Sequence, residues 1–202
     1  MEKKTLKFQQ FRKLIEQNCY DKNACGSRNE PITQEYGKLI AAKTEKEFWK
    51  VIVNNGNWCY SHGIFNTDLF EQYGQDKMAA HGIFWHSKHD AKGNCYAWGN
   101  STVTAMDNST VTAWGNSTVT AMDNSTVTAM DNSTVTARDN STVTARDNST
   151  VTARGNSTVK INNECLKGKQ SNIKQNDSSV LVDFSTKKIY IKNGGFEICY
   201  FD

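Results

Sequence analysis

Histidine and cysteine are the residues whose types and spacing in this chain could do chemistry. All four histidines follow Cys59 in one short stretch, at His62, His81, His86 and His89. Imidazole and thiolate groups are the usual protein ligands of zinc. This stretch could therefore hold a metal ion, or pair a cysteine nucleophile with a histidine base.

The same residues have plainer interpretations. His62 and His81 each precede Gly-Ile-Phe, which is typical of a helix C-terminus where glycine adopts a left-handed conformation. His86 and His89 lie in a polar linker and are expected to be solvated. No paired Cys-x-x-Cys, nucleophile elbow, glycine-rich loop or paired-carboxylate motif accompanies them. We therefore expect no metal, no cofactor and no enzymatic activity.

Composition narrows the classes of partner. The net charge of +3 is too small to indicate nucleic acid or an anionic membrane. No apolar run approaches the length of a membrane span. The first residues include lysines without an apolar stretch behind them, so no secretory signal is expected. We expect a cytoplasmic protein, or one carried in a phage particle, whose six cysteines are reduced and mostly buried.

The elements that position these residues are dominated by a repeat. Residues 98–161 form eight consecutive octads, of which the first four read WGNSTVTA, MDNSTVTA, WGNSTVTA and MDNSTVTA. Thr and Val favour strands, whereas Gly or Asp followed by Asn is typical of turns. Each octad is thus about one strand and one corner, and such short strands are stable only when successive coils stack.

The alternation of Trp-Gly with Met-Asp indicates that the true unit is sixteen residues, with two strands per coil. Met130 breaks the strict alternation, so a coil of three strands and twenty-four residues is the alternative. That coil would need larger inward residues to fill a triangular core.

Strand alternation predicts which side chains face inward. Burying two threonine hydroxyls per strand without partners would be costly, so Val, with Ser and Ala beside it, is expected inside. Both broad faces then carry Thr-x-Thr rows, which are candidate binding surfaces. The threonines that we single out are Thr102, Thr104, Thr118, Thr120, Thr134, Thr136, Thr150 and Thr152.

The variable first position of each octad forms two corner stacks, which are also candidate binding sites. One stack contains Trp98, Trp114, Met130 and Arg146, and the other contains Met106, Met122, Arg138 and Arg154. Large apolar side chains at exposed turns would favour a partner. Alternatively, each apolar side chain only covers its neighbour in the stack. The arginines favour an acidic ligand, or they are neutralised by the adjacent aspartates.

The octads resemble those of bacterial ice-nucleation proteins, through Ser101-Thr102-Val103-Thr104-Ala105 and its copies. At this size, the resemblance implies ice binding by a Thr-x-Thr face. The whole chain also looks like uncharacterised proteins of gut bacteria and their phages, which join a helical segment to degenerate octads. That second resemblance implies no function.

The flanking segments predict two caps. Helix-like apolar spacing and the capping box Thr44-x-x-Glu47 indicate a helical N-terminal capping domain at residues 1–90. The octad solenoid is expected at 91–175. Ile173 and Leu181 keep a spacing of eight and suggest one last irregular coil. Three apolar runs predict a β-meander cap at 176–202 that leaves no sheet edge open. The fold class is therefore a mainly β, two-strand-per-coil solenoid with these caps.

The function that these patterns favour is non-enzymatic binding or scaffolding. A protein partner on the Thr faces and corners is the first expectation. Ice or ordered water on the Thr rows is the second. A structural component of a phage particle or a surface adhesin is the third, and it predicts a trimer or larger assembly.

Overall fold

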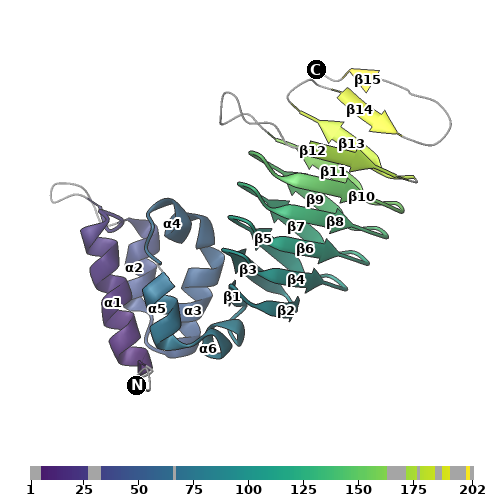
Figure 1. The fold of residues 1–202 in the computed structure, drawn as a ribbon. Coiled ribbons are helices and arrows are strands. Elements are labelled where there is room, and N and C mark those ends of the chain that lie inside the picture. The colour runs from purple at the N-terminus through teal and green to yellow at the C-terminus, as the bar shows by residue number, and fades with distance from the viewer. Residues whose placement is uncertain are drawn as a thin grey trace. The chain divides into compact units, whose positions relative to one another are not determined.

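The computed structural model describes residues 6–26, 33–65, 67–162, 172–176, 178–184, 188–191 and 199–200. The chain forms two compact units, Met1–Ile83 and Phe84–Asp202. The first is helical and the second is a β-solenoid with further strands at its C-terminal end (Figure 1). The expected fold class is confirmed, whereas covering of the first coil by the helices stays a prediction.

Helices form where the sequence predicts them. They are α1 (Phe8–Asp21), α2 (Gln34–Ala41), α3 (Glu45–Asn54), α4 (Gly56–Ser61), α5 (Thr67–Tyr73) and α6 (Gln75–Ala79). Both halves of the predicted capping box exist: Thr44 Oγ1 accepts from Glu47 N at 3.2 Å, and Glu47 Oε2 accepts from Thr44 N at 3.2 Å. These bonds satisfy backbone donors that the first turn of α3 would otherwise leave without partners.

The end of α4 also has the predicted form. His62 is its C-cap residue, and Gly63 follows with a φ of 59°. The Ile64 amide then donates to the carbonyl of Cys59 at 3.0 Å, and the Gly63 amide donates to that of Tyr60 at 2.9 Å. This pair of bonds is a Schellman motif, so the His-Gly-Ile signal at residues 62–64 is a helix stop.

Aromatic rings form the core of the helical unit. Phe11 of α1 stacks on Trp49 of α3 at 5.4 Å and on Tyr73 of α5 at 4.2 Å between ring centroids. All three side chains are buried. Rings of this size dominate core energetics, so these three helices are held mainly by one aromatic cluster.

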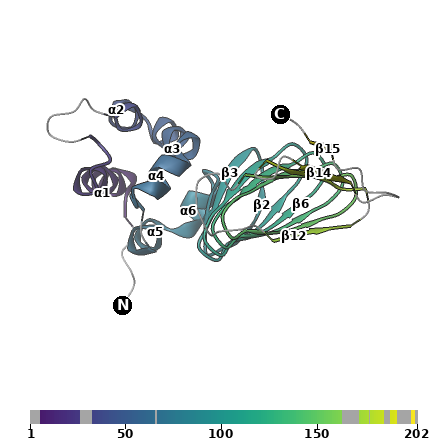
Figure 2. The same cartoon turned by 90° about the horizontal axis from the view of Figure 1, so that it is seen from above.

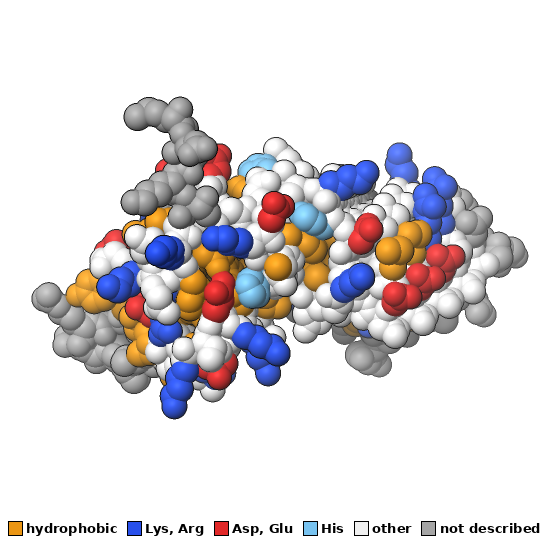
Figure 3. All heavy atoms as spheres, turned by 90° about the horizontal axis from the view of Figure 1, so that it is seen from below, with side chains coloured by type: hydrophobic (Ala, Val, Ile, Leu, Met, Phe, Trp, Pro, Cys, Tyr) orange, Lys and Arg blue, Asp and Glu red, His pale blue; other side chains and the backbone are white. Residues whose placement is uncertain are grey.

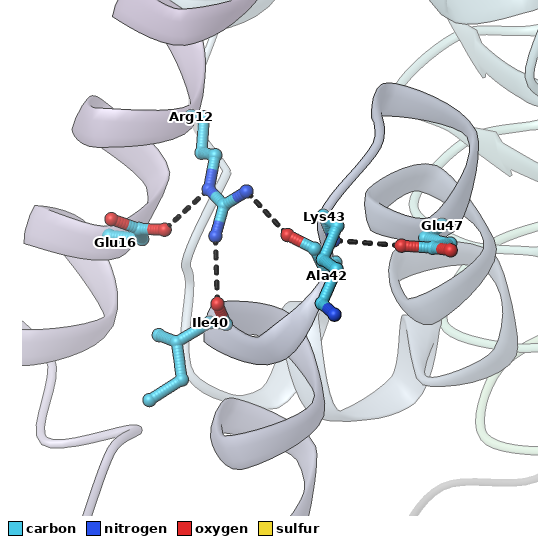
Figure 4. A network of polar contacts seen from close by, with 6 residues as sticks. All are labelled: Arg12, Glu16, Ile40, Ala42, Lys43 and Glu47. Atoms are coloured by element: carbon cyan, nitrogen blue, oxygen red, sulfur yellow. Dashed lines mark hydrogen bonds and ion pairs between the residues drawn. The ribbon is translucent and has the colours of Figure 1, made fainter.

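A single arginine ties α1 to the end of α2 (Figure 4). The Arg12 guanidinium donates to the carbonyl of Ala42 at 2.6 Å and to that of Ile40 at 2.9 Å. It also pairs with Glu16, one turn along α1, at 2.7 Å. A cation placed on the last carbonyls of a helix satisfies acceptors that have no intrahelical donor.

The solenoid consists of two facing sheets, which Figure 2 shows as the long sides of a flattened tube. Sheet A contains β1 (Ile83–Trp85), β3 (Asn94–Trp98), β5 (Thr110–Ala113), β7 (Thr126–Ala129), β9 (Thr142–Ala145), β11 (Thr158–Ile161), β13 (Val180–Asp183), β14 (Lys188–Ile191) and β15 (Cys199–Tyr200). Sheet B contains β2 (Lys88–Ala91), β4 (Thr102–Ala105), β6 (Thr118–Ala121), β8 (Thr134–Ala137), β10 (Thr150–Ala153) and β12 (Asn172–Gln175).

The register confirms a coil of sixteen residues. Thr102 pairs with Thr118 in sheet B, and Thr110 pairs with Thr126 in sheet A, with both strand pairs parallel. A coil of twenty-four residues is therefore wrong for the octads. Inward positions are filled as predicted: the valines and alanines from Val103 to Ala153 are buried, and so are the serines that precede each strand.

The first coil begins earlier than the sequence suggested. Residues 83–85 and 88–91 form β1 and β2, although the helical domain was expected to reach residue 90. Here β2 pairs in parallel with β4, so that Lys88 lies beside Thr102, fourteen residues along rather than sixteen. The octad motif is absent from this segment, and pairing with the next coil selects the strand conformation.

The last coil and the meander follow the prediction in part. Ile173 pairs with Val151 and Leu181 with Val159, so the irregular last coil exists. The antiparallel pairs β13–β14 and β14–β15 form the predicted meander, whose connecting residues 192–198 lie outside the described residues. The meander extends sheet A alone. Among the described strands, sheet B ends at β12, and covering of this edge stays a prediction.

Candidate functional site

The eight threonines singled out from the sequence all lie on the outer face of sheet B. The first row contains Thr102, Thr118, Thr134 and Thr150, and the second row contains Thr104, Thr120, Thr136 and Thr152. The first three members of the first row are exposed, and the second row is half-buried. Neighbouring rungs are about 4.8 Å apart and the two rows about 6.6 Å apart. The face is a regular lattice of hydroxyl and methyl groups.

Charged residues stand at both ends of these rows. On β2, Lys88 aligns with the first row and Asp90 with the second. On β12, Lys174 aligns with the second row, next to Thr152. All three side chains are exposed. The sequence did not reveal this alignment, because the offsets into β2 and β12 differ from sixteen and no octad marks them.

The outer face of sheet A is less regular. Its complete threonine pairs lie only on β5, β7 and β9. On β11 the second position of the pair is Lys160, and on β3 it is Tyr96. Val180 and Val182 replace both threonines on β13. Of the two faces, sheet B therefore carries the longer uninterrupted array.

The Trp corner stack forms as predicted but is not an exposed patch. Backbone bonds place Trp114, Met130 and Arg146 above one another at sixteen-residue steps. Trp98 is only 2 % exposed and Met130 only 5 %, so the prediction of an exposed apolar corner was wrong for these two. The Trp98 ring packs edge to face on the Trp85 ring, with centroids 6.4 Å apart, and coil stacking covers each side chain with the next. This corner shields the core.

The other corner stack is more accessible. Met106 and Met122 are half-buried, whereas Arg138 and Arg154 are exposed. Figure 3 shows acidic side chains in a row beside apolar ones on the solenoid. This corner is therefore apolar toward the N-terminal coils and basic toward the C-terminal coils. Its two arginines remain candidates for contact with a partner.

The corner aspartates have a structural role that sequence reasoning missed. They adopt positive φ angles between 54° and 57°, and the glycines that replace them in other octads have φ angles between 62° and 68°. The carboxylates of Asp123, Asp131, Asp139 and Asp147 also reach back one coil. For example, Asp123 Oδ2 accepts from Asp107 N at 3.2 Å, and Asp131 Oδ2 accepts from Gly115 N at 3.3 Å. A ladder of such bonds satisfies amides that the turns leave outside the sheets.

The buried serines fall into two classes. Ser101 and Ser117 donate their hydroxyls to the carbonyls of Trp98 and Trp114, both at 2.7 Å. In the octads that begin with Met or Arg, the carbonyl at the same position accepts the serine backbone amide instead, as in Ser125 N to Met122 O at 3.1 Å. The hydroxyls of Ser109, Ser125, Ser133, Ser141 and Ser157 then have no hydrogen-bond partner among the described groups.

Each of the four histidines has its own contacts within its unit. His62 Nδ1 lies 2.9 Å from Trp58 O at the end of α4, and His81 stacks on Trp49 with centroids 5.0 Å apart. His89 takes a core-facing position beside Val103 and stacks on the Phe84 ring at 4.7 Å. Because residues 88–91 form a strand, the prediction of a solvated linker there was wrong.

His86, at the first corner, is exposed and accepts from the Asn100 amide through Nδ1 at 3.3 Å. The described residues contain no group of three or more His, Cys, Asp or Glu side chains arranged to hold a metal. The three buried thiols among the described residues, Cys19, Cys59 and Cys95, are also poor candidates for nucleophiles. Burial raises the pKa of Cys19 to about 12, with a further contribution from Cys25. Burial likewise raises the pKa of Cys59 and of Cys95.

Comparison with known proteins found no match from which a function could be transferred. No protein-family model, curated protein or solved structure matches it. Within the described ranges, no helix is long and apolar enough to cross a membrane. We therefore infer the function from the faces and corners of the solenoid.

Proposed function

We propose that this chain is a non-enzymatic binding and scaffold protein that presents the threonine rows of sheet B to a protein partner. The observation that carries the proposal is the register of these rows, which places eight threonines on four successive strands without interruption. Strands hold these side chains in place before binding, which lowers the entropic cost of association. Threonine hydroxyls donate and accept, so the face can satisfy polar groups of either kind.

Two further observations support this proposal over catalysis. The thiols with raised pKa values are protonated at neutral pH, and a thiol must lose its proton to act as a nucleophile. The described histidines each contact a separate part of the structure, so they do not form a shared acid–base site. Arg138 and Arg154, at the exposed corner beside sheet B, extend the surface that a partner could contact.

The test compares the two faces of the same solenoid. A triple variant carries Thr118→Tyr, Thr134→Tyr and Thr150→Tyr on sheet B, and its matched control carries Thr110→Tyr, Thr126→Tyr and Thr142→Tyr on sheet A. Each chain is immobilised and the retained proteins are quantified, after circular dichroism has established that both variants are folded. Only the sheet B variant should lose retained proteins. Equal retention by both variants would contradict the proposal.

A second candidate is binding of ice or ordered water, and the regular spacing of the uncharged rows favours it. Rungs about 4.8 Å apart and rows about 6.6 Å apart form a repeating lattice of hydroxyl and methyl groups. Ice shaping and thermal hysteresis would be measured for the chain and the same two variants. Activity that the sheet B substitutions abolish and the sheet A substitutions preserve would support this candidate. No activity in the unsubstituted chain would eliminate it.

A further inference from the structure

The second threonine row of sheet B ends in charges of opposite sign. The row starts at Asp90 on β2, continues through its four threonines and ends at Lys174 on β12. Both end residues are exposed and share the outward face of the sheet. Five strand spacings separate them, which is about 24 Å. The row is therefore self-complementary: turned end for end, it presents each charge to the opposite one.

We propose that the partner of this face is a second copy of the chain. The two sheet B faces pack on each other across a two-fold axis parallel to the strands, which reverses the direction of the solenoid and keeps each row opposite itself. Asp90 of each copy then lies opposite Lys174 of the other. A two-fold interface uses the same patch twice, so one complementary row supplies two ion pairs. This inference rests on the proposed role of the threonine rows in binding.

The first row is compatible with the same arrangement. It begins at Lys88, and its position on β12 is Asn172, which carries no charge. Reversal therefore places Lys88 opposite an uncharged residue, and no like charges meet. The four threonine rungs between the ends oppose one another, so hydroxyl and methyl groups pack against an identical lattice.

The other two-fold arrangement of these faces is less favourable. An axis along the solenoid would keep β12 opposite β12 and exchange the two rows. It would place Lys88 opposite Asp90 at the β2 end, but it would bring the two Lys174 side chains close together without an acidic partner at the β12 end. Like charges at an interface cost free energy, whereas the reversed arrangement gives each Lys174 an acidic partner and keeps the two lysines at opposite ends.

Sheet A lacks this self-complementarity. Its second row contains Lys160, and the same reversal places no acidic residue of the row opposite that lysine. The row also contains Tyr96 and Val182, which break the flat lattice. A dimer through sheet A would bury Lys160 without a partner, which is costly.

The contact area sets the strength of the proposed dimer. Four residues on each of six strands cover about 13 Å by about 24 Å, or about 300 Å² of each chain. A standard stable interface buries about 800 Å² per partner, so the dimer is weak and forms at high protein concentration. Because its ion pairs lie at the rim, its affinity falls as salt is added.

Sedimentation of the purified full chain tests the proposal, with concentrations from about 10 μM to about 1 mM. At low ionic strength, the weight-average mass should rise above the monomer value of 22.7 kDa. Asp90→Lys alone and Lys174→Glu alone should each weaken the dimer about tenfold or more, because like charges then meet. The double variant should restore it. Lys160→Glu on sheet A is the matched control and should change nothing.

The outcomes separate this inference from the proposed function. If the unsubstituted chain stays monomeric at the highest concentration, the proposed dimer is wrong. Lys174→Glu without effect, or failure of the double variant to recover, would overturn the reversed geometry. Neither result affects the retention of other proteins by the threonine rows, which the tyrosine variants test separately. Rescue by the double variant would establish the Asp90–Lys174 contact.

Discussion

The two units of this chain reach stability in different ways. In the helical unit the contacts do not repeat: the Trp49 ring packs on Phe11 and Tyr73, and Arg12 ties α1 to the end of α2. In the solenoid one set of contacts recurs at sixteen-residue steps. A stack whose coils touch only their neighbours gains stability coil by coil, whereas a small core depends on each of its few large side chains. The comparison predicts where a substitution is tolerated.

The largest effect is expected at the aromatic cluster. Trp49→Ala removes a ring that is 1 % exposed and packs on rings of two other helices, so the helical unit should lose about 3–5 kcal/mol of stability. A loss of this size approaches the whole free energy of unfolding of a small domain. Urea unfolding followed by amide NMR signals should show the helices lost while the octad strands persist. Leu14→Ala, on an exposed side chain of α1, is the control and should leave the unfolding midpoint nearly unchanged.

Within the solenoid, equivalent positions should respond equally. Val119→Ala and Val135→Ala each remove two methyl groups from a fully buried site in the same surroundings, so each should cost about 2 kcal/mol. Hydrogen exchange of the solenoid amides measures the loss of stability in each variant, and the two losses should agree within about 0.5 kcal/mol. A much larger loss at one of them would show that the coils are not energetically alike.

The two serine classes distinguish coils that otherwise repeat. Ser117→Ala removes a buried bond to the Trp114 carbonyl and should destabilise the solenoid by about 1 kcal/mol. Ser125→Ala removes a buried hydroxyl that has no partner among the described groups, so it should be neutral or stabilising. Thermal unfolding of the two variants side by side measures the difference. Equal destabilisation would show that the hydroxyl of Ser125 is also satisfied.

The smallest expected effect is a pH dependence confined to the helical unit. Burial against Trp49 lowers the pKa of His81 below its ordinary value of 6.5, and this outweighs the opposing effect of Glu45. The unfolded chain then binds the proton more readily than the folded chain. Stability is therefore full above pH 6.5 and falls as the pH drops through that value toward the lower folded pKa. The urea midpoint of the helical signals should shift with pH, and His81→Gln should flatten this shift.

The solenoid was predictable because its pattern is both periodic and chemically unambiguous. Alternation of Val and Thr determined the inward face, and alternation of Trp-Gly with Met-Asp determined the coil length. Burial of Trp98 could not be read from the sequence, because it depends on Trp85 in a coil without the motif. The Asp123 bond to the preceding coil was likewise hidden, since a turn aspartate has the same sequence signal whether or not its carboxylate is used.

The candidate site was predictable in its middle but not at its ends. Thr118 and Thr134 follow from the octads alone. The alignment of Asp90 and Lys174 with the same row depends on irregular offsets that only the strand register reveals. The ends of a repeat array are where local pattern stops and tertiary pairing decides, and here they carry the charges that distinguish one face from the other.

The sixteen-residue register also bears on how the gene can change. Recombination that gains or loses sixteen codons adds or removes one complete coil, and every later strand keeps its sheet, its corner and its inward face. A change of eight codons would move every later strand to the opposite sheet, so that the meander would extend sheet B. Whole-coil changes alter the distance from Asp90 to Lys174 equally in both copies of a dimer. Chains of equal length would still match end to end, and chains of unequal length would not. In the proposed dimer, the number of coils encoded by a gene would therefore decide which chains can pair.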